Sequence, residues 1–180
     1  MGLVSRGKRS KGLIGGTVAL LLFLQSSPSF GAVDFITEID NTVVSMHDYS
    51  VLSGQIKSTN SASNIQKINS HMNKKLGVIR SDITTLDADL NKSWTYLGTT
   101  PNFKFPARDV MRQFDLEVFN WYNLELKIQS QVLSCYDKAS TSKQCVLKVR
   151  AKNSAAELKL YQKITDTLKQ IEIWRKAAGR

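Results

Sequence analysis

Apolar residues recur every three or four positions along most of this chain, and almost no stretch alternates between apolar and polar residues. The first pattern is typical of α-helices that bury one side, whereas alternation would mark half-buried strands. Polar stretches that contain Gly, Pro or Ser interrupt the pattern at three places. The sequence therefore predicts an all-α protein with four long helices, over residues of about 33–57, 64–97, 106–138 and 143–178.

The second of these segments has the most regular apolar stripe, with spacings of three and four sustained for about four heptads. Its members are Ile65, Ile68, Met72, Leu76, Ile79, Ile83, Leu86, Leu90, Trp94 and Leu97. Such a seam is typical of a long helix that packs at a shallow angle against its neighbours. Because the connections between the segments are short and polar, we expect an up-and-down four-helix bundle.

The two cysteines, Cys135 and Cys145, lie on either side of the polar run 139–142, which separates the last two predicted helices. We expect Cys135 in the last turn of one helix and Cys145 in the first turn of the next. In an antiparallel hairpin these turns face each other, so their backbones are close enough for a disulfide. We predict one disulfide across this hairpin; the alternative is two buried free thiols.

The first 31 residues have the composition of a secretory signal peptide. Four basic residues precede an apolar run over residues 13–24, and small or polar residues follow it. This run of 12 residues is shorter than the roughly 20 that span a bilayer, so an uncleaved anchor is the weaker alternative. We expect cleavage after Gly31, with Ser29 at the −3 position. Residues 32–180 would then be a single helical-bundle domain, exported to the periplasm or the extracellular space.

Charge is unevenly distributed along the chain. Residues 32–180 contain 21 of the 25 basic residues and all 15 acidic ones, so their net charge is +6, and the fourth predicted helix is the most basic part. Four of its lysines fall within about 60° of arc and are called the basic strip: Lys148, Lys152, Lys159 and Lys163. We expect the strip to flank the apolar stripe and to pair with acids on a neighbour, such as Asp82 and Asp89. The alternative is weak contact with anionic lipid or another acidic surface.

The third predicted helix is apolar on two sides. We expect one side, with Phe114 and Trp121, to face the core. Beside it lies Glu117, which would need a partner if it were buried. The second side is a candidate partner interface, because a helix in a four-helix bundle need bury only one. Its members are Leu116, Phe119, Tyr122 and Leu126. The alternative is that a neighbouring helix or the preceding linker covers it.

Four aromatic residues gather around the connection between the second and third predicted helices: Trp94, Tyr96, Phe103 and Phe105. We expect them to fold back over the end of the bundle. Alternatively, they form an aromatic tip that contacts a partner, since Tyr and Trp are common interface residues.

Motifs that carry chemistry are absent from the sequence. His47 and His71 are the only histidines, and neither belongs to a zinc-binding pattern; there is no GxSxG motif and no phosphate-binding loop after the signal segment. We therefore predict no catalytic residue, no metal and no cofactor. No basic loop is interleaved with aromatic residues, so we expect no nucleic-acid partner.

The leading hypothesis from these features is a non-catalytic exported interaction protein. It would be an accessory or structural subunit of a cell-envelope assembly of the secretion or conjugation type, with another envelope protein or a second copy as partner. The second hypothesis is a soluble periplasmic inhibitor or immunity protein that binds a secreted enzyme or toxin through the aromatic tip. The third is an enzyme with a site between helices.

The signal-peptide interpretation predicts that the exported protein begins at Ala32. N-terminal sequencing of exported material should therefore read from Ala32, because signal peptidase selects small residues before the cleaved bond. An intact Met1 in the envelope fraction would instead make the protein membrane-anchored.

Overall fold

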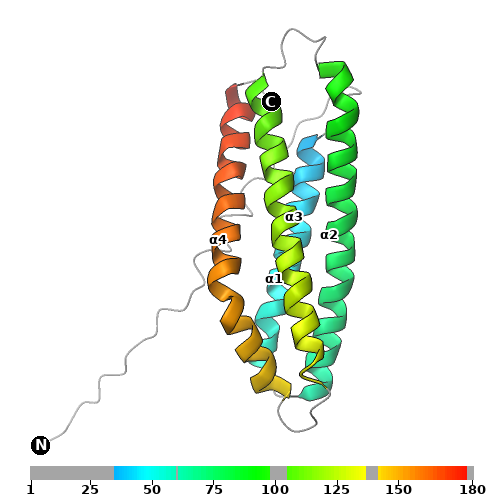
Figure 1. Ribbon diagram of the computed structural model, residues 1–180, viewed down its shortest axis with the longest axis vertical. Coiled ribbons are helices and arrows are strands. Elements are labelled where there is room, and N and C mark those ends of the chain that lie inside the picture. The colour runs from blue at the N-terminus through cyan, green and yellow to red at the C-terminus, as the bar shows by residue number, and fades with distance from the viewer. Residues whose placement is uncertain (1–34, 60, 98–104, 137–141, 178–180) are drawn as a thin grey trace, which may run out of the picture.

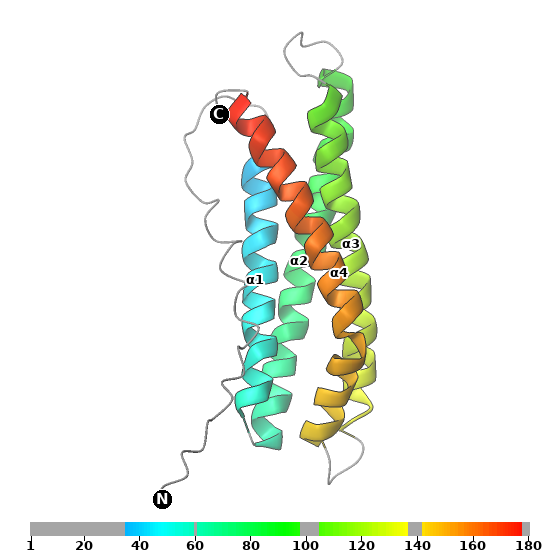
Figure 2. The same ribbon diagram turned by 90° about the vertical axis from the view of Figure 1, so that its left-hand side faces the viewer.

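The computed structural model of this protein describes residues 35–59, 61–97, 105–136 and 142–177, and these form four long helices (Figure 1). The helices are α1 (Phe35–Ser58), α2 (Ala62–Leu97), α3 (Phe105–Leu133) and α4 (Ser142–Ala177). Consecutive helices run in opposite directions (Figures 1 and 2). The predicted all-α, up-and-down bundle is therefore confirmed.

The short connection between α1 and α2 depends on a serine. The Asn64 N–H donates to Ser61 Oγ at 3.3 Å, and the Ile65 N–H donates to the Ser61 carbonyl at 3.0 Å. A serine at this N-cap position satisfies an N–H group that has no partner within the helix. The helix consequently starts at Ala62, slightly before the predicted residue 64.

Helix α3 ends at Leu133, five residues before the predicted residue 138. After this point the Cys135 N–H donates to the Val132 carbonyl at 3.0 Å, and the Tyr136 N–H donates to the Leu133 carbonyl at 3.1 Å. Bonds that span three residues tighten a helix end into a turn. Cys135 therefore lies in this turn, whereas the sequence predicts it in the last turn of the helix itself.

The predicted disulfide joins Cys135 to Cys145, which lies in the first turn of α4. The two Cα atoms are 5.7 Å apart, within the usual range for a disulfide. The bridge closes the end of the α3–α4 hairpin.

The core consists of one buried stripe from each helix. Its largest fully buried side chains include Tyr49 and Met46 of α1, Leu86 of α2, and Trp121 and Phe114 of α3. The helices pack most extensively as two hairpins, α1–α2 and α3–α4, and α2 also packs along α3, whereas α1 and α4 make little contact. Helix α4 crosses the bundle at an angle, from α3 at its start towards α1 at its end (Figure 2). The two hairpins are therefore joined mainly where α2 packs along α3.

Apolar spacing on α4 predicts a buried stripe, made of Val146, Val149, Ala156, Leu160, Ile164, Leu168, Ile171 and Trp174. Val146, Ile164, Leu168 and Ile171 are buried as expected, and Val149 and Leu160 pack against the core, but Ala156 is exposed. The polar residues Arg150 and Thr167 are also buried. The buried side of α4 therefore follows most of the predicted stripe and includes two polar residues that apolar spacing does not predict.

Glu117 of α3 is buried and has the partners that its position requires. Its carboxylate accepts hydrogen bonds from Gln113 Nε2 and from Thr167 Oγ1 of α4, both at 2.7 Å. The partners compensate part of the cost of removing the carboxylate from water.

The disulfide should stabilise the fold. Replacing both cysteines (Cys135→Ser with Cys145→Ser) is expected to lower the free energy of unfolding by about 2–3 kcal/mol, because the bridge restricts the unfolded chain. Denaturant titration measures this change. Under reducing conditions the wild-type protein and the variant should approach the same stability, whereas equal stability in oxidising buffer would contradict the prediction.

Candidate functional site

The second apolar side that the sequence predicted for α3 faces outward. Leu116, Phe119 and Leu126 are 51%, 47% and 42% exposed, and Leu133, which the sequence analysis did not include, is 55% exposed. Phe119, Leu126 and Leu133 are seven residues apart and therefore lie along one side of the helix. We call Leu116, Phe119, Leu126 and Leu133 the outer face of α3.

Tyr122 does not belong to this outer face. The sequence analysis included it in the candidate interface, but its side chain is only 7% exposed and belongs to the core. The physical reason is its angular position, which lies between the outward and inward sides of α3, and the packing of the bundle covers that edge.

Two hollows border the outer face along the seam between α2 and α3. One has a volume of about 530 Å³ and is lined by Leu116 and Phe119 of α3 with Ile83 and Thr84 of α2. The other has a volume of about 500 Å³, and its lining residues include Leu133 and Tyr136 on one side and Gln66, Asn69, Ser70 and Asn73 of α2 on the other. Lys74 also lines the second hollow. The outer face therefore borders a hollow towards α2 near each of its ends, and we call these two hollows together the groove.

The first of these hollows also contains charged groups. Arg112 of α3 lies 3.7 Å from the Asp87 carboxylate of α2 and donates to the Asn91 side chain. Burial and, to a smaller extent, the charge of Asp87 raise the pKa of Asp115 to about 6, although Arg112 opposes both effects. The hollow beside Leu116 and Phe119 therefore contains three carboxylates, Asp87, Asp109 and Asp115, and one guanidinium group.

The basic strip of α4 points into solvent. All four of its lysines are exposed, and within the described part of the chain none of them forms an ion pair. The expected pairing with Asp82 is absent: Asp82 accepts a hydrogen bond from Ser45 Oγ of α1 at 3.2 Å. The strip therefore lies beside the buried side of α4, and its side chains face water.

The remaining candidates of the sequence analysis are not brought together. The aromatic-tip side chains of Trp94, Tyr96, Phe103 and Phe105 lie outside the described residues. His71 is exposed and lines a hollow of about 410 Å³ between α1 and α2, and His47 is not among the residues that line it. Among residues 35–59, 61–97, 105–136 and 142–177, no three His, Cys, Asp or Glu side chains are grouped so as to hold a metal ion.

A buried polar cluster, which the sequence analysis missed, lies in the middle of the bundle. The Tyr49 hydroxyl of α1 donates to Glu125 Oε2 of α3 at 2.5 Å and accepts from Gln129 Nε2 at 2.9 Å. Arg150 of α4 places Nη2 3.5 Å from the Tyr49 oxygen and Nη1 3.7 Å from Glu125 Oε2. All four side chains are buried. They join three helices around one hydroxyl group, and the Met72 sulfur of α2 lies 3.7 Å from Arg150 Nη2.

The electrostatics of this cluster favour the protonated form of Glu125. Burial and, to a smaller extent, the charge of Glu157 raise the pKa of Glu125 to about 8, although Arg150 and the hydrogen bond from Tyr49 oppose this shift. Burial also raises the pKa of Tyr49 and of Tyr161 above the usual value for a phenol. The cluster can therefore hold and release one proton near pH 8, and this changes the charge buried between the hairpins.

None of the helices in the described ranges is long and apolar enough to span a membrane. The chain matches no known family model, no curated protein and no solved structure. Conclusions about function therefore rest on the surfaces and the cluster described above.

The raised pKa of Glu125 predicts that stability falls as pH rises. Between pH 4.5, the ordinary pKa of a glutamate, and about pH 8, Glu125 keeps its proton in the folded protein but loses it in the unfolded chain. The stabilisation that Glu125 contributes is therefore complete below pH 4.5 and is lost by about pH 8. The free energy of unfolding should decrease by up to about 4 kcal/mol across this window.

Glu125→Gln mimics the protonated carboxyl and should remove most of this pH dependence in denaturant titrations at pH 5, 6.5 and 8. Asp166→Asn, at an exposed position of α4, is the control and should keep the wild-type slope. A wild-type protein with constant stability from pH 5 to 8 would show that Glu125 is ionised in the fold.

Proposed function

We propose that this protein is a non-catalytic helical interaction protein that docks a partner protein through the outer face of α3. One observation carries the proposal. From Leu116 to its end at Leu133, α3 has eight exposed residues, of which four are large and apolar, three are Asn or Ser, and only Lys127 is charged. The cores of protein interfaces are likewise depleted of charge and enriched in large apolar side chains.

The exposed residues of α4 differ from those of α3. Among the α4 side chains that the structure describes, the exposed ones include many lysines, and the only large apolar ones are Leu158 and Ile173. Since both helices contribute one stripe to the same core, folding alone does not require α3 to differ on its solvent side. An exposed apolar side chain gains about 25 cal/mol for each Å² that a partner covers. Burial of the outer face of α3 by a partner is therefore favoured in free energy.

The shape of the surface favours a helical partner. Phe119, Leu126 and Leu133 repeat every seven residues, which is the spacing that meets an apolar stripe on an adjacent helix. The groove towards α2 leaves room beside these side chains. A partner that lays an amphipathic helix along the seam would bury the apolar row and leave its own polar side in water.

We further propose that this partner belongs to a cell-envelope assembly of the secretion or conjugation type, in which the present chain is an accessory or structural subunit. The signal-peptide composition of residues 1–31 supports export. The disulfide is compatible with an oxidising compartment, where such bonds persist.

Charged substitutions on the outer face should separate binding from folding. Phe119→Asp and Leu126→Asp are expected to change the free energy of unfolding by no more than about 0.5 kcal/mol, because both side chains are exposed. The same changes would bury an unpaired charge in an interface and abolish association. The measurements are thermal melting and recovery of the partner from an envelope fraction, with the mass of the complex determined.

Two controls make the comparison specific. Leu158→Asp introduces the same charge at an equally exposed leucine of α4 and should keep the partner. Trp121→Asp, in the core, should unfold the protein. If Phe119→Asp melts the protein as severely as Trp121→Asp, the outer face is buried within the monomer and the proposal is wrong.

A further inference from the structure

The outward side of α4 carries six exposed lysines and a single exposed acid. The lysines are the four of the basic strip, Lys148, Lys152, Lys159 and Lys163, together with Lys169 and Lys176. The exposed acid, Asp166, pairs with Lys169 at 3.0 Å. Glu172 is half-buried and pairs with Lys176 at 3.4 Å. Neither acid neutralises the basic strip.

The four lysines of the strip have no protein partner for their charge within the described part of the chain. They are spaced by four, seven and four residues, so they extend over roughly 22 Å along one side of the helix. Like charges this close repel one another through water, although salt screens the repulsion. An anionic surface laid along α4 would turn this repulsion into attraction for all four groups at once.

The helix that carries the strip is held firmly. Arg150, on its inner side, is bound within the buried polar cluster, and Cys145 is bonded to Cys135 at its start. The lysine backbones are therefore fixed in one row before any ligand arrives, which reduces the entropy lost on binding.

Large apolar side chains share the exposed part of α4 with the lysines. Leu158 is 51% and Ile173 is 68% exposed, and Ile173 is the most exposed large apolar residue of the described chain. A soluble polyanion offers such side chains nothing to bury against. The boundary between headgroups and acyl chains of a bilayer does, and amphipathic surface helices combine lysines with apolar side chains in this way.

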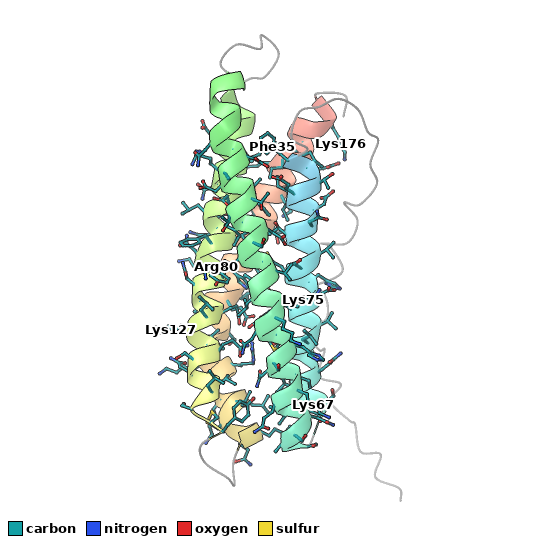
Figure 3. The ribbon with its side chains drawn as sticks, turned by 90° about the vertical axis from the view of Figure 1, so that its right-hand side faces the viewer. Phe35, Lys67, Lys75, Arg80, Lys127 and Lys176 are labelled. Atoms are coloured by element: carbon teal, nitrogen blue, oxygen red, sulfur yellow. A yellow bond between two sulfur atoms is a disulfide. The ribbon has the colours of Figure 1, made fainter. Side chains whose placement is uncertain are left out.

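We propose that the outward side of α4 binds the surface of a membrane rich in anionic phospholipid. The bundle would lie with α4 along the headgroups, its lysines contacting phosphates and Leu158 and Ile173 entering the interface. This surface is independent of the proposed docking face on α3. Helix α4 is at the front of Figure 2; in Figure 3, seen from the opposite side, α2 is in front with α3 beside it, and α4 lies behind them. A protein on the α2–α3 side and a membrane on the α4 side can therefore be bound together.

The test is binding to vesicles of phosphatidylcholine alone and of phosphatidylcholine with 30% phosphatidylglycerol, measured by co-sedimentation. The chain is used in full and also from Ala32, so that the basic and apolar residues before Ala32 are controlled. In the strip variant all four lysines become glutamine: Lys148→Gln, Lys152→Gln, Lys159→Gln and Lys163→Gln. The matched variant loses the same charge from exposed positions of α1, α2 and α3: Lys57→Gln, Lys67→Gln, Lys74→Gln and Lys127→Gln.

We expect the chain from Ala32 to bind the anionic vesicles and not the neutral ones, with an affinity that falls between 0.05 and 0.5 M salt. Each basic side chain near an anionic surface strengthens binding about fivefold, so the strip variant should bind at least about 100-fold more weakly. The matched variant should retain most of the affinity. Leu158→Ser with Ile173→Ser should weaken binding further at high salt, where electrostatic attraction is screened.

Two results would overturn the proposal. If the matched variant loses as much affinity as the strip variant, net charge alone is responsible and α4 is not a binding surface. If dextran sulfate binds as tightly as the anionic vesicles and Leu158→Ser with Ile173→Ser changes nothing, the strip recognises a polyanion and not a membrane. Circular dichroism of each variant, with the wild-type helix content required, excludes unfolding as the cause.

Discussion

The hydroxyl group of Tyr49 is the point on which the arrangement of the two hairpins depends. The hydroxyl donates to Glu125 and accepts from Gln129 of α3, and Arg150 Nη2 of α4 lies 3.5 Å from its oxygen. Apart from this, α1 and α4 make little contact. The Tyr49 ring also packs edge-on against Trp121, with centroids 5.3 Å apart. Because buried polar groups are costly when unpaired, these bonds penalise any sliding of one hairpin along the other. The cluster thus selects one relative position among the many that an apolar seam alone would permit.

This central constraint divides each helix into a side that determines the fold and a side that does not. The inner side of α3 contains Glu117, Glu125 and Gln129, which are buried and hydrogen-bonded. These bonds already determine how the helices are placed relative to one another. The apolar residues on its outer side add nothing to that specificity. On α4 the same division leaves lysines facing solvent. The two helices of one disulfide-bonded hairpin therefore offer chemically opposite surfaces, one apolar and nearly uncharged, the other basic.

Much of this architecture could be predicted from helical periodicity. The four helices, the disulfide and the outward direction of Leu116, Phe119 and Leu126 all follow from which positions share a side. Periodicity was less informative in two places. Tyr122 lies between the two sides of α3 and is buried, and the polar residues Arg150 and Thr167 of α4 occupy core positions that an apolar stripe does not predict. The buried cluster escaped prediction for the same reason. Arg150 follows Val146 by one helical turn, and Gln129 precedes Val132 by three residues, so their positions could have been noticed. That they meet at Tyr49 depends on the packing of three helices, which no single-helix pattern contains.

The disulfide has a consequence for the order in which the chain assembles. Cys135 and Cys145 are only ten residues apart, and they approach each other as soon as the α3–α4 turn forms, without any contribution from α1 or α2. Closing so short a loop costs little conformational entropy, and folds dominated by such local contacts form quickly. Oxidation can therefore precede assembly of the bundle. The α3–α4 hairpin would then meet α1 and α2 as an already crosslinked unit, and the slow search is reduced to bringing Tyr49 opposite Glu125.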